Sequence, residues 1–430
     1  MSELKMKNNL IENMLSDNSL IEENKDLKNK LLFFLVWPFG AWLYCLRSAD
    51  RRTSYIIFFL FSLLLCWHMS PNGGDDLYDD FIGIMEEFQS TLVSTDQFLT
   101  DLKGYFTFSI DAPKELYRIF SIWFVKLFTD NYHFYFLFCS IPVAIFQLKS
   151  MEYITSSPQY AAGTLMGILI IALFILPRDI ITVQNPRFAT GLWYCVYFSI
   201  WYYSRPKRNP LFFLLIFIAP LFHAAIWLFV GIFLLSLSVP VKGISILEKV
   251  ALCSIIFSFF DNEFMMGTKF TFLPDSLQIW VNGYMSESSF ARVNGPATGF
   301  GWLGITFRYL QKISYVILTV QMIKSREEEK KNDLYKFYLV VFTIINLIQF
   351  VPELSTRYYH FIAIFGVYLW FNFFGGDKKK ERAIYFVAIV FLWTALFRYG
   401  YFFGGALRVN TPPDIFITPL PYLIGKGLWW

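Results

Sequence analysis

The chain alternates between apolar segments and shorter polar or charged passages over most of its 430 residues. The longer apolar segments approach the roughly 20 residues that a helix needs to cross the hydrocarbon core of a bilayer. The pattern therefore predicts an all-α fold, a bundle of membrane helices. The expected crossings are residues 55–69, 132–148, 161–176, 188–203, 211–222, 224–237, 246–260, 302–323, 337–351, 361–374 and 383–403.

The two ends of the chain differ from this transmembrane region, residues 31–403. Residues 1–30 are polar with mixed charge, and no small-residue cleavage site follows, which predicts a cytoplasmic tail and not a cleaved signal peptide. Leu31 to Leu46 is short and interrupted by Pro38, which favours a re-entrant or interfacial helix and leaves open whether it spans the membrane. Residues 404–430, rich in proline and aromatic residues, are expected as an external tail.

Basic loops predict the orientation of the bundle, because lysine and arginine concentrate on the cytoplasmic side. The basic passages SRPKRNP, KSREEEKKNDLYK and GGDKKKER are therefore placed inside. The loops at about 70–131, 177–187, 261–301 and 352–360 then lie outside. Within the first of these loops, Asp111 and Pro113 have the residue types that start a helix, and we expect that helix to lie along the membrane surface.

Composition supports the same class of protein. Hydrophobic residues make up 56% of the chain and aromatic residues 20%, while charged residues account for only 16%. This exceeds what a soluble globular protein usually carries. The net charge of +4 is concentrated in the loops, so it reports on topology and predicts no nucleic-acid partner. The five cysteines have no paired spacing and are interpreted as small hydrophobic residues.

Polar side chains at the external ends of the apolar segments are the candidate functional residues, because ionisable groups within a membrane are costly. The predicted orientation depends on the basic loops alone and not on these candidates. The location of the candidates on one side is therefore a partly independent indication of a site. These candidates are Asp75, Asp76, Arg178, Arg187, His223, Glu353, Arg357 and His360.

Each candidate has two interpretations. Arg178 and Arg187 lie on the side where the orientation rule does not expect arginine, so they bind phosphate through bidentate guanidinium groups or anchor lipid headgroups. A predicted break at Pro220 places His223 at the apex of a hairpin. There His223 is either a base or a hydrogen-bonded residue of the helix bundle without a chemical role. Glu353 and Arg357, one helical turn apart, contact substrate or only each other.

The acidic passage GGDDLYDDF is the candidate metal site. Asp75 and Asp79, like Asp76 and Asp80, have the i,i+4 spacing that on a helix suits Mg²⁺ bound to a diphosphate. The alternative is that these residues only cap a helix N-terminus. A divalent metal is possible but not favoured, since an arginine-rich site neutralises a diphosphate by itself.

Several motifs together resemble the EpsG family. These are GGDDLYDDF, KELYRIF with Glu115 opening a helix, RFATGLWYCVYF, FHAAIW and STRYYHF. The family comprises integral-membrane polymerases of bacterial exopolysaccharide, capsule or O-antigen repeat units, akin to the Wzy polymerases. The resemblance covers about residues 55–403, and the Phe-His-small-small element with the preceding Arg-Phe-Ala helix is its most specific part. The longer N-terminal tail and the aspartate-rich first loop depart from the family pattern.

The resemblance implies a glycosyltransferase of GT-C-like architecture with roughly 10–12 membrane helices, some of them short or re-entrant. It implies polymerisation of undecaprenyl-diphosphate-linked oligosaccharide repeat units at the outer face of the bacterial inner membrane. Donor and acceptor are both lipid-linked, so no nucleotide donor is needed and no cofactor is certain. A chain-length regulator and a flippase are the implied protein partners.

For this reaction the site must stabilise a departing diphosphate and remove a proton from the acceptor hydroxyl. Arg178, Arg187 and Arg357 are assigned to the diphosphates. Asp75 or His223 is assigned as the catalytic base, and the residues alone leave that choice open. The remaining substrate-binding residues expected are Asp76, Tyr78, Glu115, Glu353 and His360.

Two other functions are weighed against this one. A membrane O-acyltransferase acting on surface glycans would use an intramembrane histidine such as His223, together with a cytoplasmic basic tunnel and a paired Asn or Asp, which the sequence does not display. A flippase or transporter of lipid-linked sugar commonly shows internal repeats, and the two halves of this chain show no convincing correspondence.

Overall fold

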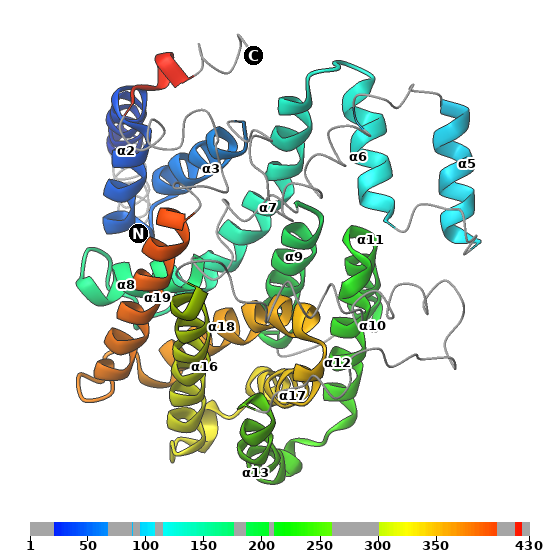
Figure 1. Ribbon diagram of the computed structural model, residues 1–430. Coiled ribbons are helices and arrows are strands. Elements are labelled where there is room, and N and C mark those ends of the chain that lie inside the picture. Colours follow the sequence, from blue (N-terminus) through cyan, green and yellow to red (C-terminus); the bar gives the residue numbers. More distant parts are fainter. Residues whose placement is uncertain are drawn as a thin grey trace, which may run out of the picture.

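The computed structural model describes residues 21–67, 88, 95–107, 115–175, 186–205, 210–259, 301–401 and 418–423. Within these residues the regular secondary structure is helical, with no strand, and the all-α prediction is confirmed (Figure 1). Residues 21–36 are helical and run through the boundary at residue 30 that was expected between tail and bundle. This helix ends before Trp37, and the next helix begins at Pro38.

The helices that follow correspond to most of the predicted apolar segments. In chain order they are α2 (Pro38–Cys45), α3 (Arg52–Trp67), α5 (Thr95–Phe106), α6 (Leu116–Lys126), α7 (Tyr132–Thr155), α8 (Leu165–Ile175), α9 (Pro186–Tyr203), α10 (Pro210–Phe213), η4 (Leu214–Ile218), α11 (Ala219–Phe222), η5 (Ala224–Ile226), α12 (Trp227–Ser238), α13 (Ile244–Ser254), η7 (Ile255–Phe259), α16 (Gly301–Ile323), α17 (Asp333–Leu347), η10 (Ile348–Phe350), α18 (Pro352–Phe374) and α19 (Glu381–Tyr401).

Side-chain caps explain where some of these helices begin. The side chain of Asn131 accepts a hydrogen bond from the backbone N–H of His133 and starts α7. The side chain of Asn332 does the same for Leu334 and Tyr335 at the start of α17. Such caps satisfy backbone donors that have no partner within the helix.

One described helix, Tyr132–Thr155, is both long and apolar enough to cross a membrane. The shorter apolar helices are Arg52–Trp67, Leu165–Ile175, Pro210–Phe222 and Ala224–Ser238. A single long apolar helix also occurs in the core of soluble proteins, so the membrane location remains a prediction.

Two local predictions differ from the structure. Pro352–His360, expected as an external turn, forms the first turns of α18, because proline at the first helical position has a φ angle suited to a helix. Pro220, expected to break the chain, lies in the first turn of α11 for the same reason. The break falls at His223, whose backbone is extended with φ −159° and ψ 130°.

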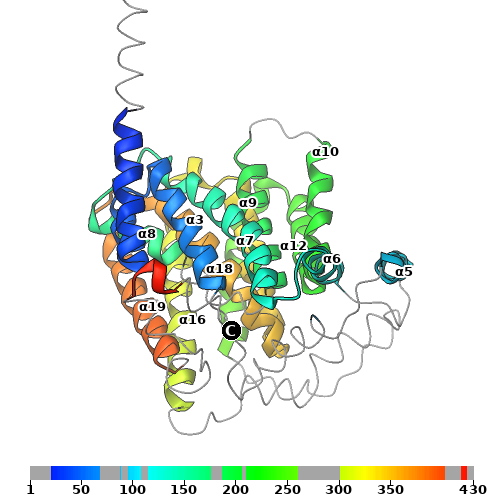
Figure 2. The ribbon, with the colours of Figure 1, turned by 90° about the horizontal axis from the view of Figure 1, so that it is seen from above.

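Within the described residues of the loop predicted at about 70–131, helices α5 and α6 lie across the bundle. Figure 2 shows α5 and α6 end-on in the view where α3 and α7 extend along the page. Helix α6 buries Ile119, Ile122 and Val125 and exposes Phe120. A helix is thus present where one was predicted, although it begins at Leu116, and Asp111 and Pro113 lie outside the described residues. Its location along a membrane surface stays a prediction.

Lysine contacts define one end of the bundle. Lys336 Nζ donates a hydrogen bond of 2.8 Å to the carbonyl of Val239, just past the end of α12. Lys330 Nζ donates one of 2.8 Å to the carbonyl of Phe373, at the end of α18. The last residue of α9, Tyr203, contacts Ser236 near the end of α12 through its hydroxyl at 2.8 Å. We call this the basic end.

Helices α9, α12 and α18 end at the basic end. Their first residues lie at the opposite end of the bundle, which we call the site end. With 18 residues, α9 is about 27 Å long. Helix α17 begins at the basic end and is therefore antiparallel to α9, α12 and α18. These helix directions match the alternation predicted from the basic loops.

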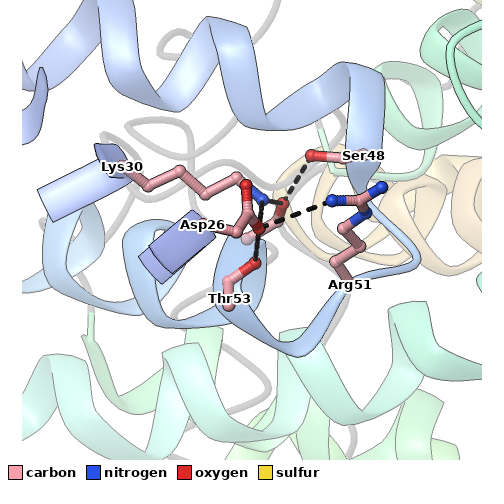
Figure 3. A network of polar contacts seen from close by, with 6 residues as sticks. Asp26, Lys30, Ser48, Arg51 and Thr53 are labelled. Carbon is pink, nitrogen blue, oxygen red and sulfur yellow. Dashed lines mark hydrogen bonds and ion pairs between the residues drawn. The ribbon is translucent and has the colours of Figure 1, made fainter. Parts of the chain in front are cut away.

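A buried lysine fastens the helix formed by residues 21–36 to the start of α3 (Figure 3). Only 2% of the Lys30 surface is exposed. Its Nζ donates hydrogen bonds to Asp26 (2.8 Å), Thr53 (2.8 Å) and Ser54 (2.9 Å). Burial raises the pKa of Asp26, but the hydrogen bonds from Lys30 and Thr53 outweigh it and leave this pKa below its ordinary value.

This network predicts a loss of stability in acid. Because the pKa of Asp26 is lowered in the folded chain, its stabilisation is complete above the unfolded pKa of about 3.9 and is lost as pH falls through the folded value. Melting temperatures in one detergent at pH 3 to 7 should therefore fall more steeply for the wild type than for Asp26→Asn. Parallel curves for the two proteins would contradict this role of Asp26.

Candidate functional site

Three of the predicted residues meet at the site end. The guanidinium of Arg187 forms an ion pair with Oε2 of Glu115, and Nε2 of His223 lies 3.3 Å from Oε1 of the same carboxylate. Only 9%, 12% and 5% of the respective side chains of Arg187, Glu115 and His223 are exposed. We refer to these three residues as the Glu–Arg–His cluster.

Arg357 lies beside the cluster. Its guanidinium carbon is 5.9 Å from the centre of the Phe188 ring, and that ring meets the His223 ring edge-on at 5.5 Å between centres. Arg357 is half-buried, whereas Arg187 is buried. The site therefore holds two arginines, of which Arg357 is the more accessible.

The residues of the site come from the starts of different helices. Glu115 is the N-cap residue of α6, and Arg187 follows Pro186 in the first turn of α9. His223 is the N-cap residue of η5, which leads into α12, and Arg357 lies in the second turn of α18. Helix N-termini carry partial positive charge and unpaired backbone donors. Their convergence makes the site end attractive to anions.

The position of Arg187 requires a negative partner. A cation at the N-terminus of its own helix is opposed by the helix dipole. Burying a guanidinium is also costly unless it is paired and hydrogen-bonded. Glu115 meets both requirements, although its contact with Arg187 spans 72 positions of the chain. Carboxylate and phosphate oxygens suit the same guanidinium donors, so an anion of either kind fits this location.

The hydrogen bonds of His223 specify how its ring is protonated. Its Nδ1 accepts a hydrogen bond of 3.0 Å from the backbone N–H of Ala225 and therefore carries no proton. In the neutral ring the proton then lies on Nε2, which faces Glu115. His223 thus directs a donor at the Glu115 carboxylate, with both ring nitrogens engaged in this state.

Tyr358 holds the chain just after His223. Its hydroxyl donates a hydrogen bond of 2.6 Å to the carbonyl of Ala225 and accepts one of 2.9 Å from the N–H of Phe229. Gly191 permits the close approach of this segment to α9, since a Cβ there would lie 3.0 Å from a side-chain carbon of Ile226. These backbone contacts fix the position of the imidazole.

Sequence reasoning did not identify Tyr358, Phe188 or Gly191 as parts of the site. A tyrosine or phenylalanine in an apolar helix has the same appearance as a core residue. Phe188 and Tyr358 fall within the quoted motifs RFATGLWYCVYF and STRYYHF, but among so many aromatic residues nothing in those motifs marks these two as site residues.

The other predicted residues are placed as follows. Asp75, Asp76, Tyr78, Asp79, Asp80 and Arg178 lie outside the described residues. Glu353 belongs to the first turn of α18, and its side chain is likewise outside the description. His360 is half-buried three residues after Arg357. Within the described ranges no group of three or more His, Cys, Asp or Glu side chains is arranged to hold a metal ion, while the predicted acidic pairs fall outside those ranges.

The fold and site define an all-helical bundle with a buried Glu–Arg–His cluster where several helix N-termini meet. Comparisons with protein-family models, with curated proteins and with solved structures find no match for the chain. The expected family and activity stay predictions.

Replacing Tyr358 with Phe should lower the free energy of unfolding by about 1–3 kcal/mol, because the buried carbonyl of Ala225 and N–H of Phe229 both lose a partner. Tyr203→Phe is the matched control at the basic end. Its partner Ser236 keeps a hydrogen bond to the Phe233 carbonyl, so the loss should be smaller. Chemical denaturation of the two purified variants measures the difference, and equal losses would contradict the special role of Tyr358.

Proposed function

We propose that this chain is a multi-pass membrane glycosyltransferase of the GT-C kind that polymerises lipid-linked oligosaccharide repeat units of a bacterial surface polysaccharide. The observation that carries the proposal is the convergence of helix N-termini, Arg187 and Arg357 at the end of the bundle opposite the basic loops. In this proposal the site end faces the exterior of the inner membrane and the basic end faces the cytoplasm.

Two features of the surface support the membrane location. Lysines gather at the basic end, as the positive-inside rule expects of a cytoplasmic side. Large apolar side chains such as Leu235, Ile256 and Trp393 are exposed on the flanks of α12, η7 and α19. Exposed apolar surface of this kind is costly in water and neutral against lipid tails.

The substrate class follows from the charge of the site. Undecaprenyl-diphosphate-linked sugar presents phosphate oxygens at the membrane surface, which is where the site end lies in this orientation. Arg187 and Arg357 supply guanidinium donors, and the starts of α9 and α18 add the positive ends of helix dipoles. A diphosphate leaving group is stabilised by such fixed positive charge as its bond to the sugar breaks.

The reaction needs a proton acceptor besides these cations. A hydroxyl oxygen of the acceptor sugar attacks the anomeric carbon of the donor, the bond from that carbon to the diphosphate oxygen breaks, and its electron pair leaves with the lipid diphosphate. The hydroxyl proton passes to a base. Among the described residues Glu115 suits this role best, with His223 directing its carboxylate. Asp75, which lies outside the description, remains the alternative base.

An arginine at the diphosphate must be distinguished from one that only anchors lipid headgroups. A lysine at position 187 keeps the charge and loses the bidentate donors, so Arg187→Lys should shorten the polysaccharide and Arg187→Ala should abolish it, each lost charge-assisted contact costing about 1.5–3 kcal/mol. Polysaccharide ladders on gels, normalised to protein level, measure the effect.

The matched control lies at the other end of α9. Arg205 stacks over Trp201 at 4.2 Å near the basic end, where a lysine anchors equally well. Arg205→Lys should therefore give a wild-type ladder. Normal ladders from both Arg187 variants would show that Arg187 is an anchor and that the proposed site is wrong.

The proposed orientation predicts which side of the membrane each end faces. Asp130, with 91% of its side chain exposed, lies beyond the end of α6 at the site end, and Glu329 is exposed in the loop at the basic end. In a background without the native cysteines, Asp130→Cys should react with an impermeant maleimide on intact spheroplasts. Glu329→Cys should react only after lysis. Labelling of both from the same side would refute the topology.

A further inference from the structure

Both oxygens of the Glu115 carboxylate are engaged in this structure. Oε2 pairs with Arg187, and Oε1 faces the Nε2 proton of His223 at 3.3 Å. A carboxylate in this state is a poor proton acceptor, because the ionised form is stabilised by both partners. The guanidinium is likewise directed at a carboxylate inside its own protein. The cluster therefore represents a resting arrangement in which Arg187 already has an anionic partner within the protein.

Binding of one ligand accounts both for the release of Arg187 from the carboxylate and for the release of Glu115 as a proton acceptor. We propose that the diphosphate of a lipid-linked substrate displaces Glu115 from Arg187, so that binding of the substrate itself uncovers the carboxylate. This inference rests on the proposed function and adds to it a coupling between substrate binding and activation of the site. A diphosphate carries more negative charge than a carboxylate and fits the same bidentate donors, so it competes well for the guanidinium.

The structure indicates which partner moves. Arg187 is part of the first turn of α9, a helix packed against α7, α11, α17 and α18. His223 is fixed through Ala225 and Tyr358. Glu115, in contrast, precedes α6 in extended backbone, with φ −140° and ψ 107°, and α6 lies across the bundle. The carboxylate is therefore the partner that can be displaced with the least rearrangement.

The exposure of the two arginines sets the order in which they meet an arriving phosphate. Arg357 is half-buried against the Phe188 ring, whereas Arg187 is buried. An arriving phosphate meets Arg357 first and then competes with Glu115 for Arg187. The His223 contact remains on the released carboxylate and keeps it within the site.

The test measures binding and polymerisation separately. Farnesyl diphosphate is the probe, and its affinity is measured for the purified full-length protein in nanodiscs. Glu115→Gln removes the competing charge and should bind the probe at least about tenfold more tightly than the wild type, since one charge-assisted contact no longer has to be broken. The same variant should make no polymer. Arg187→Ala should bind more weakly, and the double variant should lose the gain seen with Glu115→Gln.

Each alternative result has a distinct meaning. Unchanged or weaker binding by Glu115→Gln, with Arg187→Ala still impaired, would overturn the displacement and leave the proposed function intact. Wild-type affinity in Arg187→Ala would instead place the diphosphate elsewhere and remove the proposed site. If Glu115→Gln does not accumulate in the membrane, Glu115→Asp replaces it, because this change shortens the side chain by one methylene and weakens the contact with Arg187. Glu115→Asp should give a smaller gain in affinity for the probe, and the absence of any gain would overturn the inference. Farnesyl monophosphate and farnesol serve as probes that separate phosphate recognition from binding of the prenyl chain.

Discussion

The ion pair between Arg187 and Glu115 is the interaction on which the site end depends. It joins the start of α9 to the start of α6, and through His223 it reaches the segment that leads into α12. Isolated buried charges are expensive, and removing one member of such a pair leaves the other uncompensated. Buried ion pairs are often no more stabilising than apolar residues of similar volume, so stability alone is a weak reason to place one here. The proposed function supplies a further reason, because a diphosphate that replaces Glu115 would also compensate the buried charge of Arg187.

The same constraint explains why the helices start where they do. Each residue of the Glu–Arg–His cluster lies at a helix N-terminus, where backbone donors point outward from the helix. Tyr358 then holds the break at His223 by pairing with a carbonyl and an N–H on either side of the transition from η5 to α12. The proposed site is thus built mainly from helix ends, and the proposed displacement moves Glu115 at the start of α6.

Much of the helical layout could be predicted from the sequence, because apolar length and basic loops are local properties. The segment after Tyr132 and the segment before Tyr203 were both located in this way. The error at Pro352–His360 arose because a polar stretch beginning with proline resembles a turn, whereas the same proline also starts a helix. Among the site residues, Arg187, His223 and Arg357 followed from the cost of charge in a membrane. Glu115 followed only from the family resemblance, and no local pattern pairs residues 72 positions apart.

The central claim is that the Glu–Arg–His cluster and Arg357 form a diphosphate site at the outer end of the bundle. An electron cryomicroscopy structure of the protein in nanodiscs, saturated with undecaprenyl diphosphate, tests it most directly. The account predicts phosphate density between the guanidinium groups of Arg187 and Arg357, with the Glu115 carboxylate turned away from Arg187. Phosphate density at the basic end, beside Lys330 and Lys331, with the Arg187–Glu115 pair intact, would contradict it.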